Sequence, residues 1–205
     1  MVGARFSSAV SSTFFGLLVA FCLPFGIAFG SDSGAAGSLT SSGLTGLPNF
    51  HQVDDHVFRG AQPTPDGFAS LAKMGIKTVL DLRGPEHSEA DEKRIVEADG
   101  MRYISIPMRG MASPSDEQIS KALALMNDAA ASPVFVHCKR GADRTGAAVA
   151  CYRIQHDRWD AVKALNEARA LGMSWFQVAL QHYVSTFARN TPAIPALLTP
   201  AVAGQ

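Results

Sequence analysis

The fold of this chain is decided by residues 134–146, which read Val134-Phe135-Val136-His137-Cys138-Lys139-Arg140-Gly141-Ala142-Asp143-Arg144-Thr145-Gly146. The run from Val134 to His137 is typical of a buried strand in a parallel sheet. The segment from Thr145 to Asp157 has the character of a helix, and the intervening loop contains a glycine that permits a sharp turn. Strand, loop and helix in this order indicate an α/β domain, in which ligands bind beyond the carboxyl ends of the strands.

Strand and helix signals alternate along the rest of the chain. Thr64 before Pro65 marks one helix start, and the pair Ser115 and Gln118 forms a capping box at another. The pattern predicts a small three-layer α/β domain with a mostly parallel central sheet of about four or five strands flanked by helices. Besides the central stretch, strands are predicted at 57–59, 78–82 and 103–106, and helices at 65–74, 89–99, 115–131, 160–172 and 174–189.

Several distinctive side chains have a structural interpretation. The last predicted helix carries an apolar face, and two tryptophans add to the large apolar residues that we expect in the core. Asp81 and Arg83 are expected to form an ion pair, and Cys151 to be a small core residue. The histidines have no metal-binding spacing, so no metal site is expected. The residues assigned to the core or to helix packing are Trp159, Trp175, Phe176, Leu180, Tyr183, Val184 and Phe187.

The loop from Cys138 to Arg144 is suited to binding an anion. Its five intervening residues can curl so that successive backbone N–H groups point inward, at the positive end of the following helix. The guanidinium of Arg144 can hold two oxygens of a phosphate, a bidentate match that lysine does not supply. Cys138, placed among these dipoles and charges, is expected to be a thiolate at neutral pH and therefore a nucleophile.

A disulfide between Cys138 and Cys151 is not expected. About five helical residues separate the two by roughly 7 Å of rise, which is at or beyond the Cα limit for bridging. Cys138 is therefore predicted to be a free thiol.

This loop resembles the Cys-x5-Arg signature of the protein tyrosine phosphatase superfamily, and in particular its compact dual-specificity branch of the bacterial exported type. The stretches 58–63 and 78–83 are similar to those of bacterial, plant and fungal members. The resemblance implies hydrolysis of phosphomonoesters through a phosphocysteine intermediate, without metal or other cofactor. The residues that match the signature are His137, Cys138, Gly141, Arg144, Thr145 and Gly146.

The resemblance also assigns roles to single residues. Cys138 is the nucleophile, Arg144 binds phosphate and stabilises the transferring group, and the Thr145 hydroxyl assists thiolate departure. His137 fixes the loop. Lys139 and Arg140 are either solvated surface charges or groups that attract polyanionic substrates. The predicted phosphate-binding residues are Lys139, Arg140, Gly141, Ala142, Asp143, Arg144 and Thr145.

One expected residue is missing. Typical members carry a general-acid aspartate on a loop ahead of the cysteine, but the corresponding residues 107–114 contain no acid. Asp143 resembles the loop aspartate of myotubularins and of some secreted bacterial phosphatases with lipid activity, and we assign it the acid role. Two alternatives stay open: Asp143 braces the loop by accepting hydrogen bonds, or Asp116 is the acid. Asp116 is otherwise a first-turn residue that complements the helix dipole.

The substrate class is a phosphorylated protein, with phosphotyrosine or phosphoserine, or a phosphorylated lipid or inositol. Nucleic acid is not expected, because 18 Lys and Arg balance 18 Asp and Glu. We expect a monomer. Two other functions are weighed: a phosphate-binding module without catalysis, and a rhodanese-like sulfurtransferase, whose shorter loop does not fit an arginine six residues after the cysteine.

The first 30 residues differ from the rest of the chain. Arg5, an apolar run from Phe14 to Phe29 and small residues before a cut after Gly30 predict a signal peptide at 1–30. A retained membrane anchor is the alternative, but the apolar part is about 16 residues long and contains Pro24, short of the roughly 20 needed to span. We expect a periplasmic or secreted protein that contacts a membrane only if this segment is retained. The rest divides into a flexible linker at 31–47, a phosphatase domain at 48–190 and a loose tail at 191–205.

Overall fold

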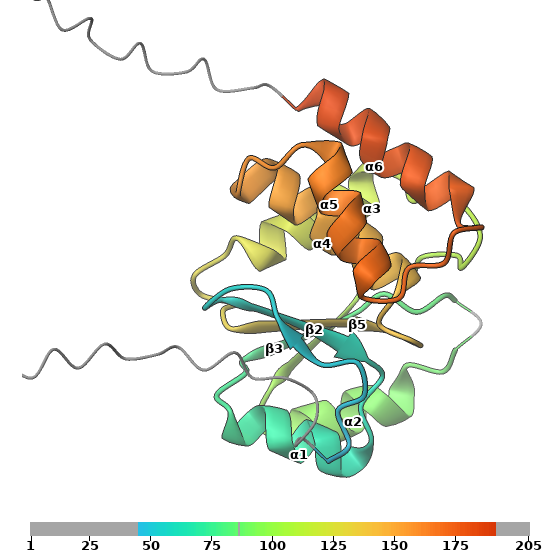
Figure 1. Cartoon of the computed structure of the whole chain (residues 1–205). Coiled ribbons are helices and arrows are strands. Elements are labelled where there is room, and N and C mark those ends of the chain that lie inside the picture. Colours follow the sequence, from blue (N-terminus) through green and yellow to red (C-terminus); the bar gives the residue numbers. More distant parts are fainter. Residues whose placement is uncertain (1–44, 86, 192–205) are drawn as a thin grey trace, which may run out of the picture. The chain divides into compact units, whose positions relative to one another are not determined.

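The computed structural model describes residues 45–85 and 87–191, all within one compact unit of the chain (Figure 1). The described part alternates strands and helices, as predicted. Its strands are β1 (His51–Gln52), β2 (Val57–Ala61), β3 (Thr78–Asp81), β4 (Arg102–Ser105) and β5 (Val134–Cys138). Its helices are α1 (Pro65–Lys73), α2 (Ala90–Ala98), α3 (Asp116–Met126), α4 (Asp143–His156), α5 (Ala161–Ala170) and α6 (Val178–Asn190).

The strands form one sheet in the order β1-β2-β5-β3-β4. Strand β1 pairs with β2 in the antiparallel sense, whereas the pairs β2·β5, β5·β3 and β3·β4 are parallel. The prediction of a mostly parallel sheet of about four or five strands is therefore confirmed, and the sheet has five. Because β5 lies at the centre, Cys138 is flanked by Ala61 of β2, its register partner, and by the end of β3, where Asp81 pairs with His137.

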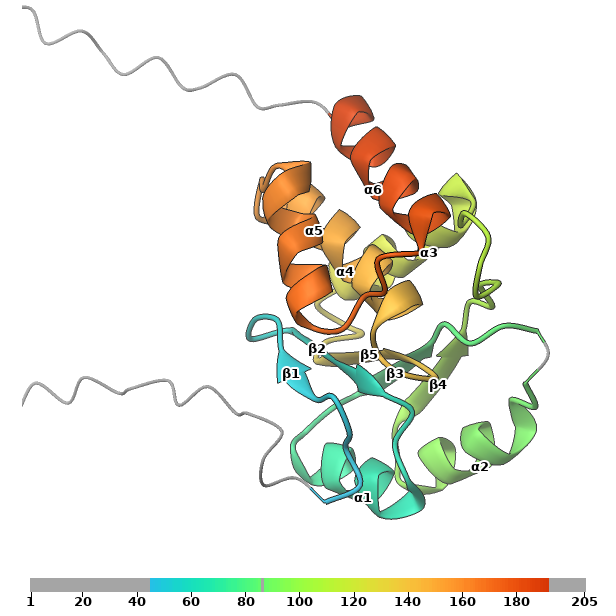
Figure 2. The ribbon, with the colours of Figure 1, turned by 45° about the vertical axis from the view of Figure 1, so that its right-hand side comes forward.

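Helices cover both faces of the sheet (Figures 1 and 2). Helices α1 and α2 pack on one face, over a core that includes Phe68, Val96 and Phe135. Helices α3 to α6 pack on the other face, over the larger core that includes Val136 and Cys151. The alternation of β5 thus sends Phe135 and Val136 to opposite sides, and the predicted three layers are confirmed.

The predicted helix starts are confirmed where a capping side chain defines them. Thr64 accepts a hydrogen bond from the Gly67 amide, and Ser115 and Gln118 form both bonds of a capping box. Two other boundaries differ from prediction. Helix α3 ends at Met126 rather than near Ala131, because Asp128 folds the following residues into a turn by accepting from the amides of Ala130 and Ser132.

Helix α6 begins at Val178, four residues later than predicted. Ser174 instead opens a turn, in which its carbonyl oxygen accepts from the Gln177 amide. Leu180 and Val184 of the predicted apolar face are buried. The prediction of core positions for Trp175 and Phe176 is wrong: their side chains are 83% and 48% exposed, since both lie in the turn before the helix.

The predicted domain boundary at Pro48 is also too late. Leu47 is buried in the core beside α1, and the Gly46 carbonyl accepts from the Thr64 amide, so residues 46 and 47 belong to the domain and not to a linker. The predicted signal peptide, most of the linker and residues 192–205 of the tail lie outside the described residues. Among the described helices, none is long and apolar enough to cross a membrane.

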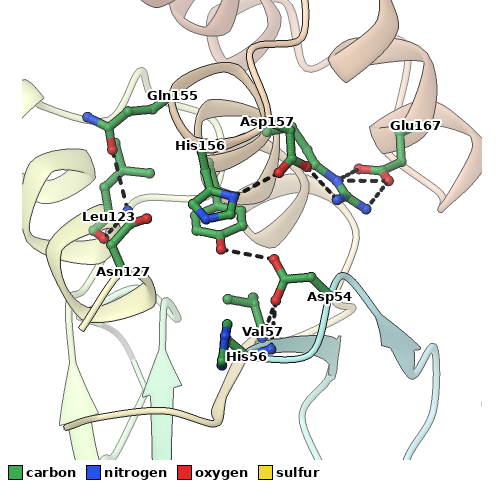
Figure 3. A network of polar contacts seen from close by, with 11 residues as sticks. Asp54, His56, Val57, Leu123, Asn127, Gln155, His156, Asp157 and Glu167 are labelled. Carbon is green, nitrogen blue, oxygen red and sulfur yellow. Dashed lines mark hydrogen bonds and ion pairs between the residues drawn. The ribbon is translucent and has the colours of Figure 1, made fainter. Parts of the chain in front are cut away.

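A polar network ties α4 to its neighbours at the amino-terminal end of the sheet (Figure 3). The carboxylate of Asp54, before β2, accepts from the amide of Val57 and from the hydroxyl of Tyr152 on α4. On the same helix, Arg153 pairs with Asp157 and with Glu167 of α5. These bonds fix the helix that begins at the loop predicted to bind phosphate.

Candidate active site

The predicted loop connects the carboxyl end of the central strand to the longest described helix. Cys138 is the last residue of β5 and is 1% exposed, and α4 begins at Asp143, two residues earlier than predicted. Ala142, at the helix N-cap, has no side-chain oxygen with which to cap the first amides. The amides at this helix start therefore have the arrangement of an anion site.

Gly141 gives the loop its shape. Its φ of +67° lies in the left-handed region, where a side chain is disfavoured. A Cβ atom at this position would also lie 2.2 Å from the carbonyl carbon and oxygen of Gly60. The absence of a side chain at Gly141 thus allows the loop to lie directly against the backbone of β2.

Arg59 of β2 supports the loop from beneath. One of its guanidinium nitrogens, Nη2, donates a hydrogen bond of 2.8 Å to the Gly141 carbonyl. Its Nε and Nη1 have no hydrogen-bond partner among the described residues, although the residue is only 1% exposed. Burial lowers the pKa of Arg59 to about 10, partly opposed by the negative charges of Glu167 and a Cys138 thiolate. Arg59 is thus a buried cation at neutral pH, and a thiolate or a phosphate in the loop would be its nearby counter-charge.

Arg144 lies in the first turn of α4, with 9% of its surface exposed. Its Nη1 donates to the Met108 carbonyl at 3.3 Å and so contacts the loop at 107–114. The Thr145 hydroxyl is buried and has no hydrogen-bond partner within the described part of the chain. Cys138, Arg144 and Thr145 are therefore brought to one loop-and-helix start, as predicted.

Asp143 is held by two partners. Its Oδ1 accepts from the Ser174 amide at 2.9 Å, and its Oδ2 accepts from Arg140 at 2.5 Å. Burial favours the protonated form, but the hydrogen bonds from Ser174 and Arg140 outweigh it and hold the pKa of Asp143 below its ordinary range. Donors at both carboxylate oxygens therefore favour the ionised form of Asp143 in the unliganded protein. These contacts match the loop-bracing alternative.

The other two predicted cations are exposed. Lys139 and Arg140 project from the loop, while its backbone is held from outside: the Lys139 carbonyl accepts from the Gln62 amide, and the Arg140 carbonyl accepts from the Asn49 side chain. Asp116, the alternative acid, is exposed at the start of α3 and accepts from the hydroxyl of Tyr183 on α6.

A buried charged cluster fixes the strand ends behind the loop. Arg83 pairs with Asp81 and Glu92, confirming the predicted ion pair and adding a second carboxylate. Nε2 of His137 lies 2.9 Å from a Glu92 oxygen, and the Tyr103 hydroxyl donates to Asp81. Although burial opposes ionisation, the bonds from Arg83, the charge of His137 and the Tyr103 hydroxyl hold the pKa of Asp81 below its ordinary value.

Three of these residues lie close enough to be considered as metal ligands: the candidate ligand atoms of Asp81, Glu92 and His137 are within 4.8 Å of one another. The spacing of the histidines in the sequence did not predict this cluster. Arg83 already supplies a positive charge to both carboxylates. The cluster therefore has the contacts of a structural network, in agreement with a loop-fixing role for His137.

The described cysteines, Cys138 and Cys151, are both free, as predicted. Sequence reasoning missed three residues that shape the loop: Arg59, Glu92 and Ser174. An arginine inside an otherwise apolar strand was a usable signal for Arg59. The sequence held no comparable signal for Glu92 or Ser174, because each reaches the site only through the packing of elements that are distant in the chain.

Comparison with known proteins identifies the family. A family described as "DSP-PTPase phosphatase fused to NAD+ Kinase" matches residues 44–186. Inositol diphosphatase DSP2 of Oryza sativa subsp. japonica is 29% identical over 147 residues, which are 70% of this chain and 65% of that protein. Dual specificity protein phosphatase TpbA of Pseudomonas aeruginosa (strain UCBPP-PA14) is 28% identical over 124 residues, which are 60% of this chain and 55% of that protein. The chain thus spans slightly less than two thirds of the first relative.

Solved structures agree with this match. The catalytic core of the PP-IP phosphatase SIW14 from S. cerevisiae, in complex with citrate, superposes with a TM-score of 0.64 at 22% identity, over 72% of this chain and 90% of that chain. P. aeruginosa TpbA gives a TM-score of 0.58 at 26% identity, over 68% of this chain and 84% of that chain. Since the family match covers more than half of the chain and the fold agrees, the chain belongs to the dual-specificity phosphatase family of the protein tyrosine phosphatase fold.

Proposed function

We propose that this protein is a cysteine-dependent phosphatase that hydrolyses phosphomonoesters through a phosphocysteine intermediate. The observation that carries the proposal is the loop from Cys138 to Arg144, which joins the central strand to an uncapped helix start. Arg59 places a buried positive charge beneath this loop. These features favour both a bound phosphate and a thiolate.

The reaction has two steps. The Cys138 sulfur attacks phosphorus, forming an S–P bond while the P–O bond to the leaving group breaks and that oxygen takes up a proton. Water then attacks phosphorus, the S–P bond breaks, and phosphate leaves as the thiolate is restored. Arg144 and the loop amides stabilise the charge on the transferred group in both steps, and the Thr145 hydroxyl donates to the departing thiolate.

Proton delivery to the leaving oxygen is assigned to Asp143. In the unliganded protein this carboxyl is ionised, because Arg140 and Ser174 donate to it. Arg140 is 58% exposed and belongs to the phosphate-binding loop, so it can turn toward a bound substrate. Loss of that partner and the arrival of a phosphate dianion both raise the pKa of a neighbouring carboxyl, as a general acid requires.

The substrate is a phosphorylated protein or a phosphorylated inositol or lipid. Relatives support both classes by name, as an inositol diphosphatase from rice and a dual-specificity protein phosphatase from P. aeruginosa. Exposed Lys139 and Arg140 beside the loop suit a substrate that carries further negative charge.

Turnover of p-nitrophenyl phosphate by the wild type and by Cys138→Ser tests the proposal. We expect turnover by the wild type that chelators leave unchanged, and none by the variant. A panel of phosphotyrosine peptide, phosphoserine peptide, phosphoinositide and inositol polyphosphate then ranks the substrate classes. Tight phosphate binding without turnover on any of them would make the protein a binding module, and persulfide transfer from thiosulfate would make it a sulfurtransferase.

Export is part of the same proposal and rests on residues 1–30 alone. Arg5, the apolar run and the small residues before Ser31 support cleavage after Gly30 and a periplasmic or secreted mature protein. Intact-mass measurement on protein from each cell fraction tests this. A mature chain that begins at Ser31 supports export, whereas a membrane-bound chain that keeps residues 1–30 would mean that the segment is an anchor.

A further inference from the structure

Four large apolar side chains are exposed around the phosphate-binding loop. Trp175 is 83% exposed, Phe176 48%, Val178 68% and Met111 64%. Exposed apolar residues are ordinary when scattered, but a group beside a ligand site calls for an explanation.

Backbone contacts place these residues at the edge of the loop. The Ser174 amide donates to Asp143, and the Ser174 hydroxyl accepts from Arg140, so the residue before Trp175 is bonded to two members of the loop. The segment that joins α5 to α6, which carries Trp175, therefore lies beside the carboxyl end of β5 (Figure 1).

Met111 belongs to the same rim. The buried Gln177 donates from Nε2 to the Met111 sulfur at 3.4 Å, and Arg144 contacts the same 107–114 loop through Met108. Val178, which follows Gln177 in the chain, and Arg109, two residues before Met111, are also exposed and extend the patch. We call Met111, Trp175, Phe176 and Val178 the apolar rim.

The backbone beneath the rim is fixed, whereas its side chains project. The Gln181 side chain donates to the carbonyl oxygens of Ser174 and Trp175, which holds the turn from the α6 side. The Trp175 and Phe176 rings contact each other edge to face, with centroids 5.8 Å apart. A rigid turn that presents two aromatic rings to solvent loses little entropy when those rings become buried in a partner.

The charges around the rim are mostly positive. Arg109, Lys139 and Arg140 are exposed on the two loops beside it. Of the acids nearest in sequence, Asp143 is held by Arg140, Asp116 accepts from Tyr183, and Glu117 is paired with Lys121. Of the three cations, Arg140 is paired with Asp143, while Arg109 and Lys139 make no ion pair among the described residues. Exposed aromatic and aliphatic groups beside such cations match the surface of a bilayer that contains anionic lipids, where aromatic rings lie at the headgroup level and basic residues are attracted.

We propose that the apolar rim docks on an anionic lipid bilayer and presents the phosphate-binding loop to phosphorylated headgroups. Docking itself is independent of catalysis, and only the cleavage of a headgroup phosphate rests on the proposed function. The alternative occupant, a phosphorylated peptide, suits the patch less well, because the four apolar side chains are about half or more exposed and because Arg109 and Lys139 add positive charge beside them.

The chain offers a direct probe of docking. It has two tryptophans, of which Trp159 contacts two cations on its ring: Arg153 Cζ lies 4.6 Å and Lys163 Nζ 3.8 Å from the ring centre. In the full chain with Trp159→Phe and Cys138→Ser, Trp175 is the single indole fluorophore and no headgroup is hydrolysed. Vesicles of phosphatidylcholine alone, and of phosphatidylcholine with phosphatidylserine, are compared with and without a lipid brominated in its acyl chain.

We expect a blue shift of Trp175 emission and quenching by the brominated lipid, both stronger with phosphatidylserine and weakened by salt. Phe176→Ser or Arg109→Gln should raise the lipid concentration at half-maximal quenching about tenfold, which corresponds to about one sixth of the binding free energy of a micromolar interaction. Val162→Ser is the matched control, because Val162 is 67% exposed but lies on α5.

If anionic vesicles containing the brominated lipid leave Trp175 emission unquenched, the proposal is wrong. This holds even if residues 1–30 attach the chain to the vesicles. An equal effect of Val162→Ser would also overturn it, as would a blue shift produced by a soluble phosphopeptide and not by vesicles. Turnover of p-nitrophenyl phosphate by the wild type is measured separately, so failure of docking and failure of the phosphatase function remain distinguishable.

Discussion

Arg59 on β2 and Gly141 in the loop from Cys138 to Arg144 are joined by a hydrogen bond from the buried guanidinium to the loop carbonyl, 2.8 Å long. The bond couples an interior strand to the turn on which the proposed chemistry depends. It also places a positive charge beneath the loop without a carboxylate in ion-pair contact among the described residues. Arg59 therefore has an electrostatic role in addition to a structural one.

Substitution of Arg59 tests this electrostatic role. In Arg59→Met, iodoacetate should alkylate Cys138 about tenfold more slowly at pH 7, since a loss of about 1.4 kcal/mol of charge stabilisation is a factor of ten in rate. Arg59→Lys should restore part of the rate. The exposed Arg102→Met on β4 is the control, and an unchanged alkylation rate in a folded Arg59→Met would limit Arg59 to structural support.

The close approach of Gly141 to Gly60 predicts a graded effect of alanine substitution. Gly100 also has a positive φ, of 80°, but a Cβ there meets nothing within 4 Å, so Gly100→Ala should cost only the backbone strain of about 1–2 kcal/mol. Gly141→Ala adds a collision with β2 and should also lower kcat/KM, by about 10²-fold if the loop moves by an ångström. Urea unfolding and p-nitrophenyl phosphate turnover measure the two effects. If Gly141→Ala and Gly100→Ala lost equal stability, and Gly141→Ala left turnover unchanged, the close contact between Gly141 and β2 would be contradicted.

Asp143 gives a prediction that depends on the leaving group. Asp143→Asn should slow hydrolysis of an alkyl phosphate by about 10²–10⁴-fold and spare p-nitrophenyl phosphate, whose leaving group needs no proton. Because the pKa of Asp143 is below its ordinary range in the free protein, the wild-type ratio of alkyl to aryl kcat/KM should rise as the pH falls from 7 to 5. The ratio should be flat in the variant.

Equal losses on both substrates would mean that Asp143 only braces the loop through Arg140 and Ser174. A selective loss in Asp116→Asn would instead transfer the acid role to α3.

The buried pair of Asp81 and Arg83 predicts a pH dependence of stability. The pKa of Asp81 is lowered in the folded protein. Its contribution to the free energy of unfolding is therefore fully present above the unfolded-state pKa near 3.9, and is lost as the pH falls through the lower folded-state pKa. Asp81→Asn should therefore lower the free energy of unfolding by about 3 kcal/mol at pH 6, and by less at pH 3. The comparison variant is Asp91→Asn, at an 86% exposed side chain, which should change stability little at pH 6. A loss in Asp81→Asn that is the same at both pH values would be inconsistent with ionisation of Asp81.

Much of the fold could be predicted because local signals and tertiary structure agree. The capping residues Thr64 and Ser115 define helix starts through contacts within one turn, and the apolar run at 134–137 is buried on both faces. The Cys138 loop was predictable for the same reason: its strand, turn and helix start are contiguous in the chain.

The features that sequence reasoning missed depend on contacts between distant segments. Ser174 reads as a helix start, but its amide and hydroxyl are bonded to a loop 31 residues earlier, which delays α6 and leaves Trp175 exposed. Glu92 reads as a solvated helix residue, yet it is 4% exposed because His137 and Arg83 surround it. The lowered pKa of Asp143 has the same origin, since the Ser174 amide donates one of the two hydrogen bonds that its carboxylate accepts.

The central claim is that phosphate passes through the sulfur of Cys138. Mass spectrometry of enzyme quenched with acid during turnover of p-nitrophenyl phosphate tests it most directly. We predict a single phosphoryl group on the peptide that contains Cys138, present during turnover and absent after substrate is exhausted. An active enzyme with no phosphorylated cysteine, or a Cys138→Ser variant that retains wild-type turnover, would contradict the mechanism.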